Sequence, residues 1–195
     1  MAVGWVSFVL AALAGTQIPE PSTPYIVKHA CPFECCQLGT WVAESSLPAY
    51  PAEGDTSDIG FVVAPGETIE ALDADVRMEQ FGQVLVKAPW AGYSAGDTVL
   101  VLGYEGEGSF SIWHAGTLRH VEMFWWIPPE LTAPEDRPDL SDPALRPRAE
   151  MIVPPVMDWW VRVRRQGVEG YLRLRNRTNF GFSTWERIRG SDGCG

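Results

Sequence analysis

The chain has 195 residues, of which 46% are hydrophobic and 21% charged, a composition that excludes disorder and allows one good core or two small ones. Its formal net charge of −10 disfavours nucleic acid as a partner, because an acidic protein repels polyanions at long range. The charge is uneven: 10 basic and 5 acidic residues lie from Leu145 onward, against 5 basic and 20 acidic before it. We therefore expect the basic tail to pack across the acidic body.

The N-terminus has the features of a secretory signal. No charged residue lies between Met1 and Pro19, and Ala12-Leu13-Ala14 supplies the small-x-small pattern that precedes a cleavage site. We predict a signal peptide over residues 1–14 and a periplasmic or secreted protein. No Lys or Arg precedes the apolar stretch, which leaves an uncleaved anchor or a buried strand as alternatives. Prolines interrupt the stretch before it reaches the length of a membrane span, so we expect no stable span after signal removal. No Cys follows the small residues, so we also expect no lipid anchor.

Three of the four cysteines lie in the segment CPFECC, at Cys31, Cys35 and Cys36, and the fourth is Cys194. An even number of cysteines in an exported chain indicates disulfides. Adjacent Cys35 and Cys36 can hardly bond to each other, so we predict one local bridge from Cys31 and one long bridge from Cys194 to the N-terminal segment. A zinc site of these four, or with His29 in place of one, is the main alternative, although C-x3-C-C is a poor match to the usual paired spacing. Free or redox thiols are the third.

Alternation with a period of two, and the lack of a helical period, predict an all-β fold. The predicted strands are Leu47–Tyr50, Ile59–Ala64, Thr68–Leu72, Gln83–Lys87, Thr98–Tyr104, Ser109–His114 and Leu118–Trp126. Eight prolines between Ile127 and Pro155 then predict a surface connector whose ends dock through Ile127, Met151 and Ile152. The predicted organisation is a Cys-rich segment (15–39), a β region (40–126), a Pro-rich connector (127–157), and a closing hairpin with a Cys-tethered tail (158–195).

The clearest hairpin lies in DWWVRVRRQGVEGYLRLRNR, with Gln166-Gly167 in its turn. Alternation predicts that one face is apolar and the other basic. The apolar face holds Val161, Val163, Leu172 and Leu174, and the basic face holds Arg162, Arg164, Arg173 and Arg175.

Two parts of the chain resemble the bacterial Src-homology-3-like (SH3b) barrel. Leu47 to Leu72 is similar to its opening half, and Trp160 to Leu172 to its closing W-x-x-V and G-x-x-G-Y-L hairpin. Gly96 to Leu102 repeats the signal of Gly66 to Leu72 and suggests a second, partial copy. The CPFECC start, the centre from Gly106 to Gly116 and the terminal Cys194-Gly195 also resemble a group of uncharacterised exported bacterial proteins. The resemblance implies one barrel split by an insertion, or two small barrels in tandem.

The resemblance implies a non-catalytic module that binds a cell-wall glycan or peptide, or an envelope protein. Aromatic residues at predicted strand ends and loops supply the candidate contacts, because an exposed Trp beside carboxylates suits stacking on sugars or peptides. The predicted ligand-binding residues are Trp90, Tyr104, Trp113, Trp125 and Trp159, with Glu105 and Glu107 tuning ligand charge. In the pair Trp159-Trp160 one side chain is expected in the core and the other on the surface, since neighbours on a strand take opposite faces. Burial of both between two packed sheets or barrels is the alternative.

An enzyme is the alternative. The chain has none of the common hydrolase, metalloprotease or nucleotide-binding motifs, and the glycine-rich GYEGEG lacks a following Lys and carries repelling acids. His114 and His120 flank Gly116 and, with Glu105, Glu107 or Glu122, would form a metal or acid/base site of a hydrolase. A protein adaptor is a third reading. We expect no cofactor.

Overall fold

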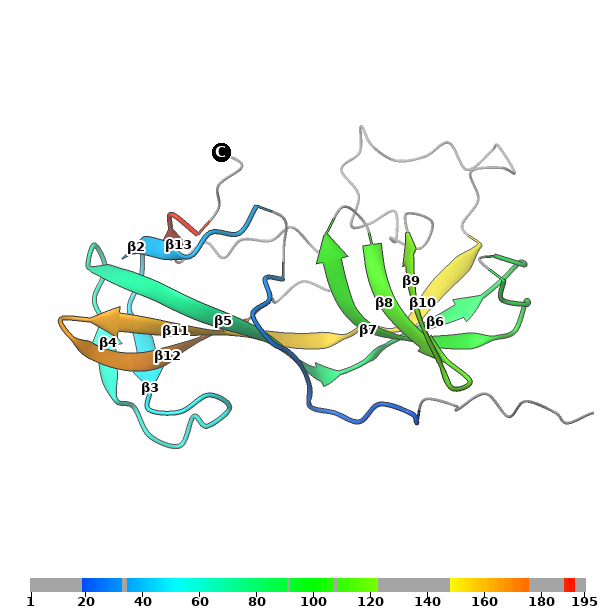
Figure 1. Cartoon of the computed structure of the whole chain (residues 1–195), viewed down its shortest axis with the longest axis horizontal. Helices are drawn as coiled ribbons and strands as arrows, with labels where there is room; N and C mark the ends of the chain where they lie inside the picture. The colour runs from blue at the N-terminus through cyan, green and yellow to red at the C-terminus, as the bar shows by residue number, and fades with distance from the viewer. Residues whose placement is uncertain are drawn as a thin grey trace, which may run out of the picture.

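The computed structural model describes residues 19–32, 35–90, 92–106, 109–122, 148–175 and 188–191. Every regular element within these ranges is a β-strand, so the all-β prediction is confirmed. The strands form two sheets, which lie one after the other along the long axis of the molecule (Figure 1).

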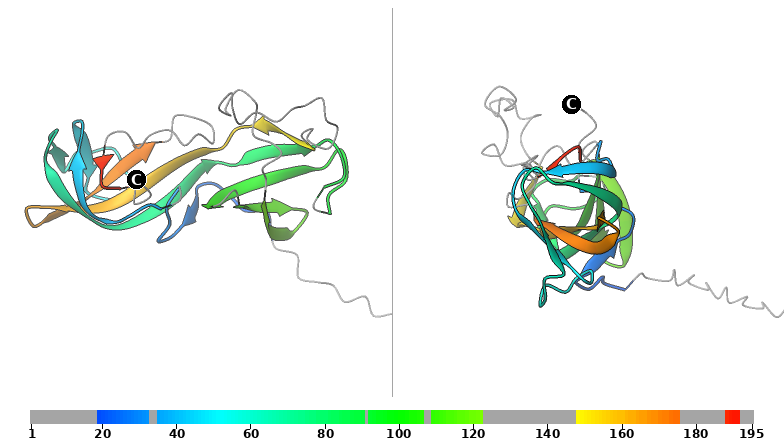
Figure 2. Two further views of the ribbon diagram at one scale, coloured as in Figure 1. Left: turned by 90° about the horizontal axis from the view of Figure 1, so that it is seen from above. Right: turned by 90° about the vertical axis from the view of Figure 1, so that its left-hand side faces the viewer.

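The first sheet has eight strands and curls into a half-barrel, which is seen end-on in the right-hand view of Figure 2. Its order is β13-β2-β5-β11-β12-β3-β4, and β1 also pairs with β5. The strands are β1 (Tyr25–Val27), β2 (Gly39–Ala43), β3 (Leu47–Tyr50), β4 (Phe61–Val63), β5 (Thr68–Gln80), β11 (Val156–Arg165), β12 (Val168–Arg175) and β13 (Ile188–Arg189).

The second sheet has five strands in the order β10-β6-β7-β8-β9. They are β6 (Gly82–Val86), β7 (Thr98–Gly106), β8 (Ser109–His114), β9 (Thr117–Glu122) and β10 (Ala149–Val153). β6 to β9 form an antiparallel meander, and β10 adds at the β6 edge.

A long antiparallel ribbon joins the two sheets. β5 continues through Phe81 into β6, and β10 continues through Pro154-Pro155 into β11, while β5 pairs with β11 and β6 with β10. Figure 2 shows both strands running from one sheet into the other. Residues 82–153 are thus inserted between β5 and β11, and the opening strands share the first sheet with the closing hairpin.

Each sheet has its own hydrophobic core, and β7 contributes to both. The larger core fills the curl of the first sheet, where Trp41 and Trp159 are fully buried with their ring centroids 5.4 Å apart. The smaller core lies on one face of the second sheet. Alternate residues of β7 enter the smaller core (Val99, Val101) and pack against the larger one (Leu100, Leu102).

The predicted strands agree with the observed ones at β3 and β8 and differ by a few residues at β4, β6, β7 and the start of β9. β5 extends to Gln80, eight residues beyond the predicted end at Leu72, and three short strands, β1, β2 and β13, were not predicted. The predicted part of the last strand beyond Glu122, and the docking of Ile127, lie outside the described residues.

The connector prediction over 127–157 is wrong at its C-terminal end. Residues 149–153 form β10, because this stretch contains no proline and its backbone donors are free to pair with β6. Pro154 and Pro155 lie between β10 and β11, where the ladder is interrupted.

The hairpin prediction is confirmed. β11 and β12 pair from Asp158↔Arg175 to Arg165↔Val168, so Gln166 and Gly167 form a two-residue turn with φ of 49° and 84°. Two consecutive positive φ values match the type I′ turn. The four predicted apolar residues are buried in the larger core, and the four arginines lie on the opposite face.

Candidate functional site: a polar pocket on the first sheet

A pocket of about 420 Å³ opens on the face of the first sheet that lies opposite the larger core, here called the outer face. Two cross-strand rows form its floor. One row runs from Asp73 on β5 through Arg162 on β11 to Tyr171 on β12, and the other joins Asp75 on β5 to Trp160 on β11. The strand alternation explains the placement, because Ala74, Val76 and Val161 between these residues point into the core.

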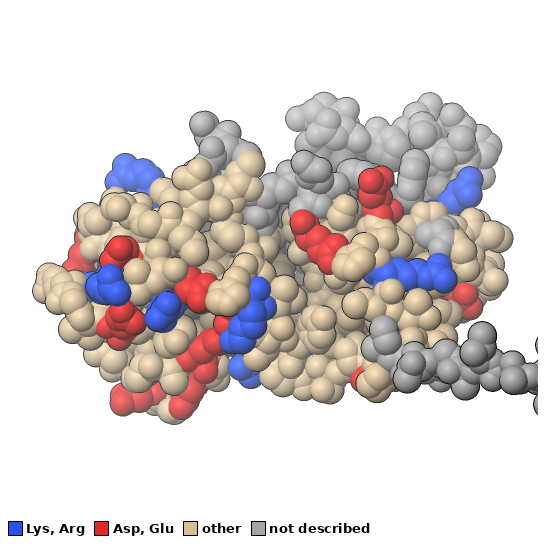
Figure 3. Space-filling model, viewed as in Figure 1, with Lys and Arg blue, Asp and Glu red and all other residues tan. Residues whose placement is uncertain are grey.

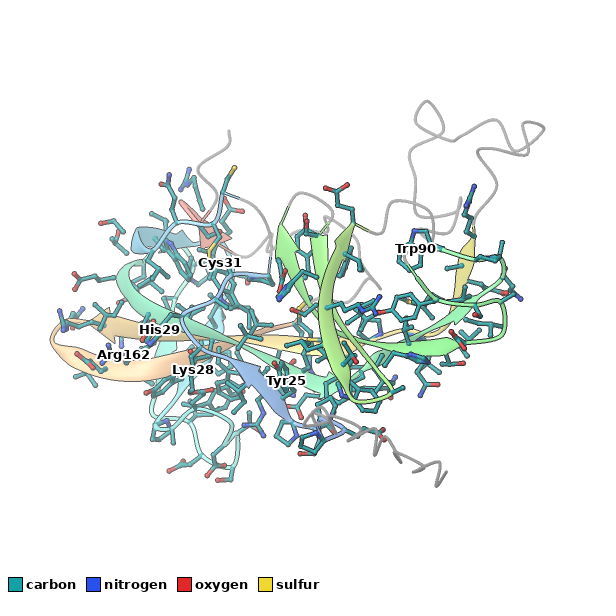
Figure 4. The ribbon with its side chains drawn as sticks, turned by 45° about the vertical axis from the view of Figure 1, so that its right-hand side comes forward. Tyr25, Lys28, His29, Cys31, Trp90 and Arg162 are labelled. Carbon is teal, nitrogen blue, oxygen red and sulfur yellow. A yellow bond between two sulfur atoms is a disulfide. The ribbon has the colours of Figure 1, made fainter. Side chains whose placement is uncertain are left out.

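Two loops supply the walls of the pocket. Lys28 and His29 follow β1, and the backbone amide of Ala30 donates to the carbonyl of Ala74 at 2.9 Å, which holds this segment along β5. Glu53 comes from the loop between β3 and β4. Figure 4 shows Lys28 and His29 beside Arg162 over the first sheet, and Trp90 far away in the second sheet.

The charged groups of the pocket are paired with one another. Lys28 Nζ lies 2.5 Å from Asp75 Oδ2 and 3.1 Å from Glu53 Oε2. His29 donates its backbone amide to Asp75 Oδ1, and its Nδ1 lies 2.9 Å from Asp73 Oδ1. Figure 3 shows the result at the surface, where acidic and basic side chains alternate over the first sheet.

These contacts separate the pKa values of the carboxyl groups. Burial raises the pKa of Glu53 despite its bond from Lys28. Burial acts in the same direction on Asp75, but the hydrogen bonds from Lys28 and from the His29 amide outweigh it and lower the pKa of Asp75. The hydrogen bond between His29 and Asp73 raises the pKa of the imidazole and lowers that of the carboxyl.

Two buried polar atoms in the pocket residues have no hydrogen-bond partner: Trp160 Nε1 and Glu53 Oε1. Trp160 is only 2% exposed. The indoles of the larger core are satisfied, because Trp41 donates to the carbonyl of Gln37 at 2.8 Å and Trp159 to that of Ala30 at 3.2 Å. Outside the pocket, the buried Nε1 of Trp113 is also without a partner. An unsatisfied buried donor costs about 1–3 kcal/mol, so each of these atoms is a place where a ligand gains free energy.

The Trp160 ring is held in place by its neighbours. The Tyr50 ring lies 5.8 Å away at a tilt of 58°, and the guanidinium of Arg173 lies 5.8 Å from the indole centroid. Arg173 is in turn fixed by Asp158, which is fully buried and accepts from both Arg173 and Arg175. The indole N–H is therefore pre-positioned, and the pocket offers one fixed donor, one carboxyl acceptor and the half-buried ring of Tyr171.

The structure does not bring the predicted ligand-binding residues together in this pocket. Trp90 and Tyr104 lie in the second sheet region, where Trp90 pairs with Tyr93 and Tyr104 contacts Phe110. Glu105 binds His120 at 2.7 Å and also accepts from Ser111. Trp113 is half-buried on β8 and packs against the larger core. Glu107 and Trp125 lie outside the described residues.

Trp159 is 0% exposed and belongs to the larger core, so its ring offers no surface to a ligand. The expectation that one member of the Trp159-Trp160 pair is exposed is wrong, since both are buried. They do take opposite faces of the sheet, and the walls around the pocket cover Trp160.

The alternative site at His114 and His120 is not assembled. Register pairs Ser111 with His120 and His114 with Thr117, which places the two histidines on opposite faces of the second sheet. His114 packs its ring edge-on against Tyr93 at 5.3 Å, whereas His120 binds Glu105. Within the described ranges no group of three or more His, Cys, Asp or Glu residues is arranged to hold a metal ion.

The three cysteines that the structure describes are disulfide-bonded. Cys31 and Cys36 form the local bridge, as predicted, and Cys35 is also in a disulfide. Oxidised sulfurs do not ligate zinc, so the zinc alternative is wrong for these three residues. Cys194 lies outside the described residues, but the amide of Gln37 donates to the carbonyl of Ser191 at 2.8 Å, which brings the C-terminal segment beside CPFECC.

Asp73 and Asp75 were missed at the sequence level because the predicted strand beginning at Thr68 ends at Leu72. Alternation within LDADV does place the two acids on one face, but this face is the outer one only because β5 changes phase at a bulge between Ala71 and Asp73. Nothing in the sequence pattern placed Lys28 or Glu53 beside them.

Comparison of the chain with protein-family models, with curated proteins and with solved structures gave no match. Over the part of the chain that the structure describes, no helix is long and apolar enough to cross a membrane.

Proposed function

We propose that this protein is an exported, non-catalytic binding module that holds a glycan or peptide group of the cell envelope, or of an envelope protein, in the outer-face pocket. One observation carries the proposal: the same pocket contains a buried indole donor and a buried carboxyl oxygen that nothing in the described residues satisfies. A rigid site with a few placed polar groups is what small-ligand recognition requires.

Two further observations support the cellular setting. The Cys31–Cys36 disulfide is typical of proteins that mature outside the reducing cytosol, in line with the predicted signal peptide. The opening strands and the closing hairpin that resemble an SH3b barrel are neighbours in one sheet, with residues 82–153 inserted between them. We therefore propose one barrel split by an insertion, rather than two small barrels in tandem.

The test is co-sedimentation of the purified, oxidised protein with isolated cell-wall material. Wild-type protein is compared with Trp160→Phe, which removes the pocket donor, and with Trp113→Phe, which removes another buried, unpartnered indole N–H outside the pocket. We expect the first variant to lose binding and the second to retain it. Loss of binding in Trp113→Phe alone would place the binding site among the predicted aromatic residues of the second sheet. Failure of the wild-type protein to sediment with cell-wall material would contradict the proposed function.

Hydrolysis is the second candidate, because Glu53 and Asp75 share the Lys28 ammonium and their pKa values move in opposite directions. Paired carboxyl groups with separated pKa values are the usual acid and base of glycoside hydrolysis. Incubation of envelope fragments with the protein, followed by mass analysis of released products, separates the two. Turnover that Glu53→Gln abolishes would establish the enzyme and overturn the non-catalytic proposal.

A further inference from the structure

Resting on the proposed function, we infer that the ligand of the outer-face pocket is a neutral saccharide unit, one of whose hydroxyl groups accepts from Trp160 Nε1–H and donates to the carboxyl of Glu53.

The charges of the pocket disfavour a charged ligand. Lys28 is shared by Glu53 and Asp75, Asp73 is paired with His29, and Arg162 lies 3.6 Å from Glu169. Each of these charged groups already has a partner of opposite sign. A carboxylate or phosphate would lose its hydration and find Lys28, His29 and Arg162 already bound to carboxylates, and an ammonium would have to share Glu53 and Asp75 with Lys28. Each is a net cost.

The two residues that carry the unsatisfied atoms both line the pocket and are linked through Asp75. Trp160 is the direct cross-strand partner of Asp75, and Lys28 links Asp75 to Glu53. One atom is an N–H donor, and the other is a carboxyl oxygen that accepts when ionised. A ligand group that satisfies both from one position must donate and accept at once.

A hydroxyl group meets this requirement with a single oxygen, which carries one donor and two lone pairs. A trans peptide group does not, because its N–H and C=O lie in the peptide plane and point in opposite directions. A saccharide also presents C–H groups, and the half-buried ring of Tyr171 lines the pocket to receive them. The pocket volume of about 420 Å³ falls in the range that encloses small organic ligands.

The experiment is an NMR titration of the full, oxidised chain labelled with ¹⁵N, following the indole N–H of Trp160, which Trp160→Phe assigns. The probes are maltose and N,N′-diacetylchitobiose as neutral sugars, glucosamine and glucuronate as charged ones, and N-acetyl-triglycine amide as a neutral peptide. We expect a saturable shift with at least one neutral disaccharide, and affinity about tenfold or more weaker for both charged sugars.

The variants separate the hydrogen bonds from the fold. Glu53→Gln keeps the size of the side chain but loses the charged acceptor, and we expect about tenfold weaker binding of the neutral sugar, the effect of one charge-assisted hydrogen bond. Trp160→Phe lacks the indole reporter, so its binding is followed on the backbone amide resonances of the pocket, and we expect it to be about fivefold weaker. Tyr93→Phe, which removes a hydroxyl in the smaller core outside the pocket, is the control, with unchanged affinity. If Trp160→Phe does not fold, the Glu53→Gln titration still tests the inference.

The outcomes distinguish this inference from the proposed function. A shift of the Trp160 resonance by the peptide and not by the sugars would overturn the saccharide and leave the binding module in place. Stronger binding of glucuronate or glucosamine than of neutral sugars would refute the neutral pocket. If neither these probes nor solubilised cell-wall fragments move the resonance, both the saccharide and the proposed function fail.

Discussion

Asp158 allows the sharpest prediction about what holds the pocket together. Its carboxylate is 0% exposed and accepts three hydrogen bonds, at 2.8 and 2.5 Å from Arg173 and at 2.9 Å from Arg175. Asp158→Asn keeps the shape of the side chain but leaves two guanidinium groups without a counter-charge. Breaking a buried ion pair costs about 3–5 kcal/mol, and the partial exposure of the arginines, 24% and 56%, lets them recover some hydration.

We therefore expect Asp158→Asn to lower the free energy of unfolding by about 2–3 kcal/mol. Urea denaturation of the oxidised protein measures it, and with a slope of about 2 kcal/mol per molar the midpoint falls by about 1 M. Arg175→Gln is the control, with a loss below about 1 kcal/mol because its side chain is mostly exposed. Equal midpoint shifts for the two variants would show that the buried carboxylate does not stabilise the outer face.

Three other changes have defined outcomes. Gly167→Ala places a side chain at φ 84°, so the free energy of unfolding falls by about 1 kcal/mol in urea denaturation, and an unchanged midpoint would contradict the turn geometry. Replacing Cys31 and Cys36 by Ser opens a loop of about six residues and costs about 2 kcal/mol in the loop-entropy treatment, measured by the same assay. Asp73→Asn returns the pKa of His29 toward its ordinary value, measured by NMR titration of the imidazole.

The His29–Asp73 pair also gives a pH dependence of stability. The pKa of His29 is raised in the folded protein, so its contribution is complete below the unfolded pKa and is lost as pH rises through the folded one. The pKa of Asp73 is lowered, so its contribution is lost only as pH falls through that lowered value. The stability difference between wild type and Asp73→Asn is thus expected to be larger at about pH 5.5 than at about pH 9. An equal stability difference at the two pH values would show that the His29–Asp73 ion pair does not contribute to stability.

Local patterns predicted the elements whose two faces differ most. The β11–β12 hairpin alternates Val or Leu with Arg, and its turn has residues suited to positive φ, so both its pairing and its orientation were readable. β5 was predicted too short because LDADVRMEQ has charged residues on every second position and few large apolar residues. Its alternation changes phase at a bulge between Ala71 and Asp73, and beyond the bulge Ala74, Val76 and Met78 lie in the core.

The pocket depends on contacts that local patterns do not carry. Glu53 and Lys28 are 25 residues apart in sequence and bind each other directly at 3.1 Å, and Lys28 also binds Asp75, which lies on a strand between two long-range partners. The aromatic residues predicted from strand ends lie in several separate places. Whether a Trp is buried depends on which loops cover its face of the sheet, and local patterns do not carry this information. Trp160 illustrates this dependence. Strand alternation predicts that its side chain points away from the larger core, and the loops that form the pocket walls bury it there, which makes it a candidate for ligand binding.

The ribbon shared by the two sheets has a consequence for the order in which the chain folds. β6 to β9 are consecutive and need only short connections, whereas β5 meets β11 through pairs such as Glu70 and Arg164, which are 94 residues apart. Closing such a distance is slow compared with forming a hairpin. During synthesis, the β6–β9 meander can assemble before β11 and β12 complete the half-barrel. The pocket, whose floor includes both strands, is therefore among the last features of the molecule to form.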